Sequence, residues 1–304
     1  MTNNASLSTT VTLNNGVEMP VLGLGVFLSP PELTATAVRV AIAKGYRLID
    51  TASAYKNERA VGQGLRASGI DRGQIFVTTK VFPSQYGFEQ TLRAFDDSLA
   101  RLGIAYLDLY LLHWPVPTDF ALTVEAYRAA EKLLADGRVR AIGVSNFGSD
   151  DIERLVKATQ VVPTVNQVEL HPFFTQQAIR KACRKHGIIT EAWSPIGGVF
   201  QRNRKATASM GANGPLDHPT VTKLAGKYAK TPAQVVLRWH LQHGIVAIPK
   251  SVHAERIAEN ADVFDFRLTK EEMRRIDDLD TGVRAGSDPA TFTRDSYHVN
   301  IDDQ

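Results

Sequence analysis

The sequence predicts an α/β protein that folds as one closed (β/α)8 barrel, the TIM barrel, with residues 1–304 in a single domain. Short apolar runs rich in Val, Ile, Leu and Tyr recur along the chain, as expected of buried parallel strands. Amphipathic segments separate these runs, and a glycine follows several of those segments, where it ends a helix. Strands alternating with helices build a parallel sheet, and eight repeats indicate that the sheet closes into a barrel.

Eight apolar runs account for the expected strands. In order they are Val21–Gly25, Tyr46–Asp50, Ile75–Thr79, Leu107–Leu112, Arg140–Gly143, Pro163–Val168, Ile188–Glu191 and Ile245–Ile248. Four of the helices run up to a glycine: Glu32–Lys44, Phe88–Leu102, Val124–Asp136 and Gln176–His186 precede Gly45, Gly103, Gly137 and Gly187. Two more helices begin at capping boxes, Thr231 with Gln234 and Thr269 with Glu272.

Three segments lie outside the repeat. Val11–Leu13 and Val17–Met19 flank Asn14-Asn15-Gly16, a tight-turn sequence, and predict an N-terminal β-hairpin. Residues 197–217 form a long basic connection after the seventh strand, and residues 280–304 form a tail rich in Gly, Pro, Thr and Asp. Because long loops on the strand-end side of a barrel usually serve ligands, we expect both to be cofactor or substrate loops, with extra helices on that side.

The composition excludes several classes of protein. Charges of both signs are mixed and sum to only +3, so nothing indicates a nucleic-acid partner. No apolar run approaches the roughly 18 residues that span a bilayer, and residues 1–10 lack the apolar stretch of a signal peptide. The single cysteine, Cys183, allows no internal disulfide and is interpreted as a packing residue of a helix, which favours a cytoplasmic location.

Polar side chains stand at the ends of the predicted strands. Tyr55 lies in the loop after the second strand, and the other members are Asp50, Lys80, His113, Ser145, Asn146, Gln167, Trp193, Ser194, Lys250 and Ser251. In a closed barrel all of these positions share one rim, where barrel enzymes place their active sites. The sequence therefore predicts one polar cleft built from residues far apart along the chain.

Four of these residues make a coherent proton-transfer group. A phenol with a pKa of about 10 is a poor acid at neutral pH, and a nearby Lys80 ammonium would lower the pKa of Tyr55. Asp50 would hold Lys80 charged, and His113 would bind the substrate oxygen, so that charge developing on a carbonyl is stabilised. Taken singly, Asp50 and Lys80 also fit a structural ion pair, His113 a packing residue and Tyr55 a surface tyrosine.

A hydride donor is needed beside this group. Gly23-Leu24-Gly25-Val26-Phe27-Leu28 lacks the third glycine of a dinucleotide-binding fingerprint, so these glycines are expected to serve a turn or a close approach by a ligand. Trp193 offers a flat face for a nicotinamide, and Ser145, Asn146 and Gln167 offer hydrogen-bonding groups. Lys250, Ser251 and Arg256 lie beside the start of a helix near His253, which suits either a cofactor phosphate or a substrate phosphate.

Ordered motifs connect the chain to a known family. They are residues 47–58 (RLIDTASAYKNE), 78–80 (TTK), 109–115 (LYLLHWP), 143–147 (GVSNF), 166–172 (NQVELHP) and 248–251 (IPKS). On the strength of these motifs the chain resembles the aldo-keto reductase superfamily, and the resemblance extends from Val11 to about Gly282. It is most similar to the bacterial branch that contains 2,5-diketo-D-gluconate reductases and broad-specificity carbonyl reductases.

The resemblance implies a role for each matching residue. Asp50, Tyr55, Lys80 and His113 match the catalytic tetrad, and Phe27, Phe82, Trp114 and tail residues after Gly282 match the substrate pocket. The cofactor-binding set that it implies is Gly25, Thr51, Ser145, Asn146, Gln167, Trp193, Ser194, Pro195, Ile196, Gly198, Lys250, Ser251, Val252, Arg256, Glu259 and Asn260. The family implies NADPH, with NADH as the less favoured cofactor, no metal and a monomer.

Four positions depart from the common pattern of the family. Trp193 stands where many members have Tyr and offers a larger surface to a nicotinamide. Phe27 and Phe82 stand where Trp is frequent, which indicates a wider pocket. Lys56 replaces a common Gly beside Tyr55, and its cation would favour acidic substrates unless the solvent surrounds it.

The sequence thus predicts an NADP-dependent aldo-keto reductase that reduces small aldehydes, ketones or keto-sugars, with Tyr55 as the general acid. Two alternatives remain open from the residues. A barrel lyase would use Lys80 to form a Schiff base with its substrate. A redox sensor would bind NADPH with little turnover.

Overall fold

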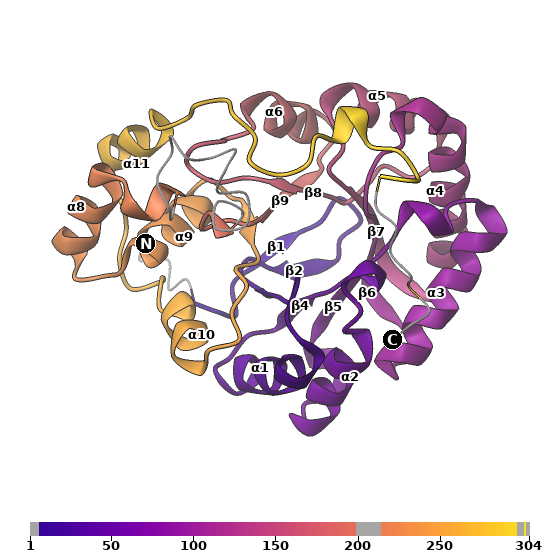
Figure 1. The fold of residues 1–304 in the computed structure, drawn as a ribbon, viewed down its shortest axis with the longest axis horizontal. Coiled ribbons are helices and arrows are strands. Elements are labelled where there is room, and N and C mark those ends of the chain that lie inside the picture. Colours follow the sequence, from indigo (N-terminus) through magenta and orange to yellow (C-terminus); the bar gives the residue numbers. More distant parts are fainter. Residues whose placement is uncertain (1–5, 199–213, 297–300, 302–304) are drawn as a thin grey trace.

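Eight parallel strands close into a barrel in the computed structural model, which describes residues 6–198, 214–296 and 301 (Figure 1). The strands are β3 (Leu24–Gly25), β4 (Leu48–Asp50), β5 (Phe76–Val81), β6 (Leu107–Leu112), β7 (Val139–Ser145), β8 (Val165–Glu169), β9 (Ile189–Trp193) and β10 (Val246–Ala247). Each pairs with its neighbour in chain order. The segment containing β3 meets β10 through the Leu22–Ala247 and Gly25–Lys250 bridges, so the predicted barrel is confirmed.

Helices surround the sheet (Figure 1). They are α1 (Pro31–Ala43), α2 (Glu58–Ala67), α3 (Phe88–Leu102), α4 (Phe120–Ala135), α5 (Ser149–Ala158), α6 (Gln177–Lys185), α8 (Pro219–Tyr228), α9 (Pro232–Gln242), α10 (Ala254–Ala261) and α11 (Lys270–Asp277). Both predicted capping boxes form, at Thr231 for α9 and at Thr269 for α11. The glycines expected to end helices take positive φ, from 66° at Gly103 to 99° at Gly45.

Four strands extend further at their carboxyl ends than the apolar pattern predicts, namely β5, β7, β8 and β9. Lys80, Ser145 and Trp193 were expected after strand ends, but they lie within β5, β7 and β9. The backbone ladder explains the difference, because its hydrogen bonds do not depend on whether a side chain is apolar. These side chains are therefore held on paired strands rather than on loops.

The N-terminal hairpin closes one end of the barrel. It consists of β1 (Thr10–Thr12) and β2 (Glu18–Pro20), which pair antiparallel. Leu13 and Met19 are buried in one cluster with the barrel residues Leu48, Phe76, Leu109, Ala141, Val165 and Val246. Asn14 Nδ2 also donates to the Pro163 carbonyl at 2.9 Å. The hairpin thus seals the N-terminal ends of the strands with apolar side chains.

Two glycines before α1 stand where the barrel leaves no room for a side chain. A Cβ at Gly25 would lie 2.8 Å from the Ile248 carbonyl oxygen, and one at Gly23 would lie 2.5 Å from Leu48 Cγ. Both contacts are with neighbouring parts of the barrel. Barrel closure therefore suffices to explain the absence of a side chain at Gly25, and the expected approach of a ligand to this position stays a prediction.

The C-terminal tail returns to the strand ends. Thr281 N donates to the Phe173 carbonyl at 3.0 Å, and the backbone N–H groups of Ala285 and Gly286 each donate to the buried Glu169 carboxylate at 2.8 Å. Of the predicted loops, residues 199–213, 297–300 and 302–304 lie outside the described part of the chain.

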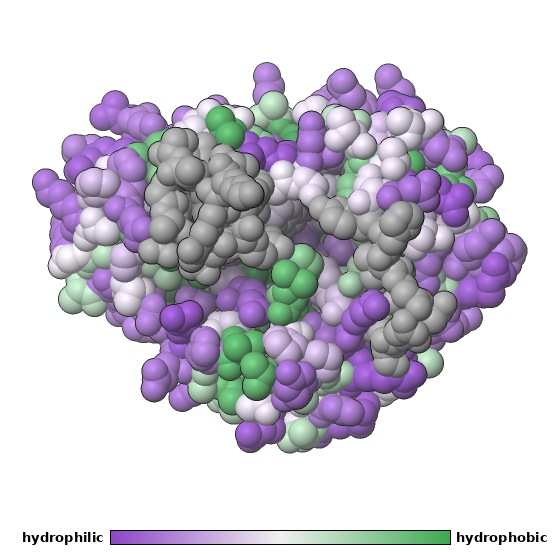
Figure 2. Space-filling model, viewed as in Figure 1, coloured by the Kyte–Doolittle hydropathy of each residue, from purple (hydrophilic) through white to green (hydrophobic). Residues whose placement is uncertain are grey.

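The described part of the face in Figure 2 is mainly hydrophilic. On the face in Figure 2, exposed hydrophobic side chains form small separate patches among polar ones. Among the helices that the structure describes, each is too short or too polar to cross a bilayer.

Candidate active site

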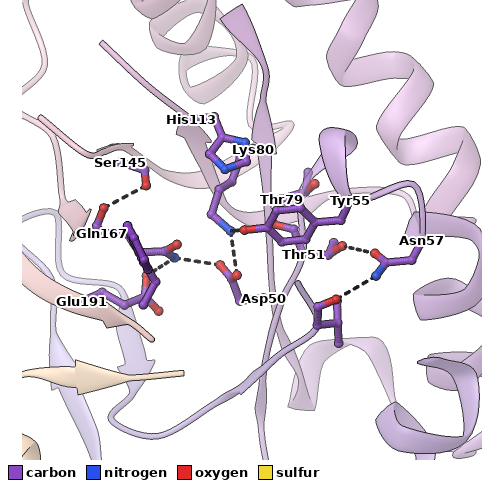
Figure 3. A network of polar contacts seen from close by, with 12 residues as sticks. Asp50, Thr51, Tyr55, Asn57, Thr79, Lys80, His113, Ser145, Gln167 and Glu191 are labelled. Atoms are coloured by element: carbon purple, nitrogen blue, oxygen red, sulfur yellow. Dashed lines mark hydrogen bonds and ion pairs between the residues drawn. The ribbon is translucent and has the colours of Figure 1, made fainter. Parts of the chain in front are cut away.

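The strand ends bring Asp50, Lys80 and Tyr55 together (Figure 3). Asp50 ends β4, Lys80 lies on the adjacent β5, and Tyr55 ends η1 (Ser53–Tyr55). Lys80 Nζ donates to Asp50 Oδ1 at 2.6 Å, to the Thr51 carbonyl at 2.9 Å and to Tyr55 Oη at 3.4 Å. An ammonium has three donors, so Lys80 has each of them directed at one of these oxygens.

Lys80 keeps its charge although it is fully buried. Burial lowers the pKa of Lys80, but the negative charge of Asp50, the interaction with Tyr55 and the Asp50 hydrogen bond outweigh it and raise the pKa overall. The tyrosine hydroxyl therefore lies beside a fixed positive charge. An ammonium at this place stabilises a phenolate, the species that a tyrosine acid leaves behind.

His113 follows β6 and faces the same group. Its ring lies edge-on to Tyr55 with centroids 5.6 Å apart, and edge-on to Phe82 at 5.7 Å. Burial and then the charge of Lys80 lower the pKa of His113 well below its usual value, so the imidazole is neutral. A neutral imidazole carries one N–H donor and can bind a carbonyl oxygen.

Asn57 and Glu58 support this group and were missed in the sequence. Asn57 accepts from the Thr51 hydroxyl at 2.8 Å and donates to the Val26 carbonyl at 2.9 Å, which ties the Phe27 loop to the Tyr55 loop. Glu58 accepts from Thr79 and Arg101 at 2.6 Å each. Asn57 and Glu58 end the motif at residues 47–58, but their types alone indicated no partner. Thr51, expected to bind cofactor, is the residue whose hydroxyl makes the bond to Asn57.

The residues expected to bind a carboxamide are also brought together. Trp193 Nε1 donates to Asn146 Oδ1 at 2.8 Å, and Asn146 Nδ2 donates to the His113 carbonyl and to Ser145 Oγ. The Ser145 hydroxyl donates to the Gln167 carbonyl at 2.8 Å. The hydrogens of the Asn146 amide are thus committed within the chain, so its remaining capacity is as an acceptor at Oδ1.

Gln167 links this set to the tetrad and to a residue that the sequence did not single out. Its Nε2 donates to Asp50 Oδ2 and to Glu191 Oε2, each at 2.8 Å (Figure 3). Glu191 lies on β9 and is fully buried. Burial and the charge of Asp50 raise the pKa of Glu191 to about 8, against the Gln167 hydrogen bond and the charge of Lys80. Its place inside a strand gave no signal of this contact.

The expected phosphate group lies at the start of α10. Lys250 and Arg256 are exposed, and Ser251 is buried with its Oγ accepting from the His253 N–H at 3.1 Å. Val252 is half-buried and Asn260 is buried. Glu259 Oε1 accepts from the Thr231 hydroxyl at 2.7 Å, so this carboxylate is engaged with the start of α9.

The segment after β9 is held from behind by α9. The buried His240 hydrogen bonds through Nε2 to the Pro195 carbonyl at 3.0 Å. Pro195 is buried, Ile196 half-buried and Gly198 exposed. This tether fixes the loop whose residues were expected to bind the cofactor.

Aromatic side chains surround the tetrad on the outer side. Phe27 is 39% exposed and lies 4.8 Å from the Tyr55 ring. From the tail, Phe292 stacks on Trp114 at 4.3 Å and lies edge-on to Phe82 at 6.2 Å. Phe292 and Ile301 cluster with Phe82, so the tail residues anticipated in the pocket include these two.

Strained backbone marks the same loops. Leu28, Lys56, Asn146 and Ser194 take φ between 49° and 66°, and each lies in a segment that follows a barrel strand. Such conformations cost about 1–3 kcal/mol and concentrate at functional sites. The value of 56° at Lys56 explains why glycine suits this position, and the Lys56 side chain is half-buried.

A model of the Aldo/keto reductase family matches residues 22–281 of this chain. The chain belongs to the aldo/keto reductase family. The resemblance inferred from the ordered motifs is thereby confirmed, and the protein is an oxidoreductase of this family.

Known aldo/keto reductases resemble the chain over nearly all of its length. Morphine 6-dehydrogenase of Pseudomonas putida is 54% identical over 293 residues, which cover 96% of this chain and 98% of that protein. Glyoxal reductase of Bacillus subtilis is 48% identical over 285 residues, covering 93% and 97%. The crystal structure of a Bombyx mori aldo-keto reductase in complex with NADP has a TM-score of 0.84 at 35% identity, covering 93% and 96%.

Proposed function

We propose that this protein reduces small aldehydes, ketones or keto-sugars to alcohols with NADPH, and that Tyr55 is the general acid. The observation that carries the proposal is the contact of the Lys80 ammonium with Tyr55 Oη at 3.4 Å, while Asp50 holds the same ammonium at 2.6 Å. A buried cation beside a phenol favours loss of the phenolic proton. The arrangement suits protonation of an oxygen at this place.

The chain has groups that fit a nicotinamide cofactor. Trp193 presents a half-buried indole held by Asn146, next to acceptor oxygens of Asn146 and Gln167. Lys250 and Arg256 are exposed cations beside the Ser251 hydroxyl, which suits the extra phosphate that distinguishes NADPH from NADH. We therefore assign the carboxamide to the first group and the 2′-phosphate to the second. When bound, NADPH supplies hydride to the carbonyl carbon.

The side chains divide the remaining work. His113, neutral and with no hydrogen-bond partner at Nδ1 among the described residues, can donate a hydrogen bond to the carbonyl oxygen. Tyr55 donates the proton to that oxygen, and Lys80 stabilises the phenolate that remains. Asp50 keeps Lys80 in place. Because all of these groups come from one chain, we expect a monomer to be active.

The surrounding side chains favour small carbonyl compounds. Phe27 lies against Tyr55, while Trp114 and Phe292 form a stacked wall from two distant parts of the chain. Aromatic faces bind apolar or ring-shaped groups through area and edge contacts. The half-buried Lys56 beside Tyr55 would add a preference for substrates that carry a carboxylate.

The geometry counts against a Schiff-base lyase. A lysine nucleophile must be a neutral amine, whereas Lys80 is held charged with its three donors directed at oxygens. The sensor alternative predicts tight NADPH binding without useful turnover. Oxidation of NADPH across a panel of aldehydes, ketones and keto-sugars decides between a reductase and a sensor.

The test combines that panel, run with NADPH and with NADH, with Tyr55→Phe. We expect kcat of Tyr55→Phe to fall by roughly 10²–10⁴-fold, the usual contribution of a general acid, with little change in the Kd for NADPH. Tyr106→Phe is the matched control, because Tyr106 lies before β6 at the opposite end of the barrel and its hydroxyl contacts the Arg72 carbonyl. Full activity in Tyr55→Phe with cofactor binding intact would show that another group supplies the proton.

A further inference from the structure

Glu191 is a buried carboxyl group that the tetrad does not include. It lies on β9 with a fully buried side chain. Its Oε2 accepts from Gln167 Nε2 at 2.8 Å, and its Oε1 has no hydrogen-bond partner among the described residues. The charged groups that act on it are Asp50 and Lys80. Stability does not account for a carboxyl in this place.

Burial of the Glu191 carboxyl costs free energy. A buried carboxyl loses its hydration, and an oxygen without a partner adds to that penalty. Replacing both members of a buried polar pair by apolar groups of similar shape is often neutral or stabilising, so packing alone does not require the Gln167–Glu191 pair. The contact that Glu191 makes must therefore be explained by what Gln167 does.

Gln167 uses both of its amide hydrogens on carboxyl oxygens. One is donated to Asp50 Oδ2 and the other to Glu191 Oε2, each at 2.8 Å. The last torsion of a glutamine is broad, so a single hydrogen bond leaves the amide plane free to turn. Two bonds to different strands fix the plane, and a flipped amide would set its oxygen against the Asp50 carboxylate. Oε1 is then the atom left to accept a hydrogen bond from a ligand.

We propose that Glu191 is a positioning residue that, together with Asp50, fixes the Gln167 amide so that its oxygen accepts from the NH₂ group of the nicotinamide carboxamide. The inference rests on the proposed function, which assigns the carboxamide to Asn146 and Gln167. Asn146 Oδ1 already accepts from Trp193 and has one further lone pair, so these two oxygens match the two hydrogens of that NH₂ group.

The experiment compares NADP⁺ with its 3-acetylpyridine analogue, in which a methyl group replaces that NH₂. Their Kd values are measured by quenching of tryptophan fluorescence in the wild type, Gln167→Ala, Glu191→Met, Glu191→Asp and Glu191→Gln. Glu191→Met removes the acceptor, and Glu191→Asp keeps the carboxyl but withdraws it by one methylene. Glu191→Gln is the matched control, because its amide oxygen can still accept from Gln167.

We expect the wild type to prefer NADP⁺ by about tenfold, which corresponds to one to two hydrogen bonds. The preference should fall to about threefold or less in Glu191→Met, Glu191→Asp and Gln167→Ala, and should remain in Glu191→Gln. Glu191→Asp carries the test if Glu191→Met does not fold.

Two results would overturn the inference. The first is that Glu191→Met and Glu191→Asp both prefer NADP⁺ over the analogue as strongly as the wild type does, while Gln167→Ala loses this preference. The second is that Glu191→Asp keeps the preference for NADP⁺ while Glu191→Gln loses it. The preference would then depend on the charge of residue 191 and not on the length of its side chain. Failure of the proposed function looks different, because the wild type itself would then bind NADP⁺ weakly or reduce no carbonyl.

Discussion

The two ends of this barrel bury side chains to the same extent but of opposite character. At the N-terminal end, Leu13 and Met19 from the hairpin are at most 2% exposed and pack on the apolar barrel interior. At the C-terminal end, Asp50, Lys80 and Glu191 are at most 1% exposed and carry ionisable groups. Apolar burial stabilises a fold, whereas burial of charge opposes folding. The difference shows that one end holds the barrel together and the other has another use.

The largest effect should come from removing the central cation of the polar end. We expect Lys80→Met to lower kcat/KM by at least a hundredfold, because Tyr55 loses the charge that stabilises its phenolate. Stability should fall as well, since Asp50 would keep an uncompensated buried charge. The double variant Asp50→Asn/Lys80→Met removes that charge. Urea unfolding should show that the double variant is more stable than Lys80→Met, while its activity stays as low. A double variant that regains activity would contradict the division between the two ends.

The reciprocal change is made at the sealed end. Met19→Ala should lower the free energy of unfolding by about 2–5 kcal/mol, because it leaves a cavity beneath a fully buried side chain. The kcat should stay within about twofold of the wild type at a temperature where the variant is folded. Val17→Ala, on the same hairpin but half-buried, is the control with the smaller loss. A large fall in kcat for Met19→Ala would mean that the sealed end also shapes the site.

The smallest effect is the pH dependence that Glu191 adds to stability. Burial and the charge of Asp50 raise the pKa of Glu191 from 4.5 to about 8, so the folded chain binds this proton more tightly than the unfolded chain. The stability linked to that proton is present below about pH 4.5, declines as the pH rises and is lost above about pH 8. Glu191→Gln cannot titrate. The melting temperature of Glu191→Gln minus that of the wild type should therefore increase from pH 5 to pH 9. If the two melting temperatures change in parallel with pH, Glu191 is already ionised at the low end of this range.

Local pattern was sufficient for the barrel and for much of the site. The apolar runs predict the strands because a strand buried on both faces must be apolar throughout, as in β6 over Leu107–Leu112. Gly103 ends α3 as predicted, because glycine tolerates the left-handed conformation. Asp50, Lys80 and His113 were recognised because a charged or polar residue directly beside an apolar run stands out.

Contacts across the barrel could not be read in the same way. Gln167 and Asp50 are separated by 117 positions, and they meet only because closure of the sheet places β8 and β4 around one interior. Glu191 and Asn57 have ordinary surroundings in the sequence, and their importance comes from the partner that closure gives them. Phe292 likewise meets Trp114 only when the tail is anchored on Glu169.

The sequence by itself determined the order of strands and helices, where helices stop, and which residue types reach the open rim. These properties depend on residues a few positions apart, which interact in any conformation that forms the local element. The tertiary structure alone decided which side chains share hydrogen bonds at that rim, and how Gln167 is oriented between two carboxyl groups. Such contacts join distant segments, and they exist only after the whole barrel has closed.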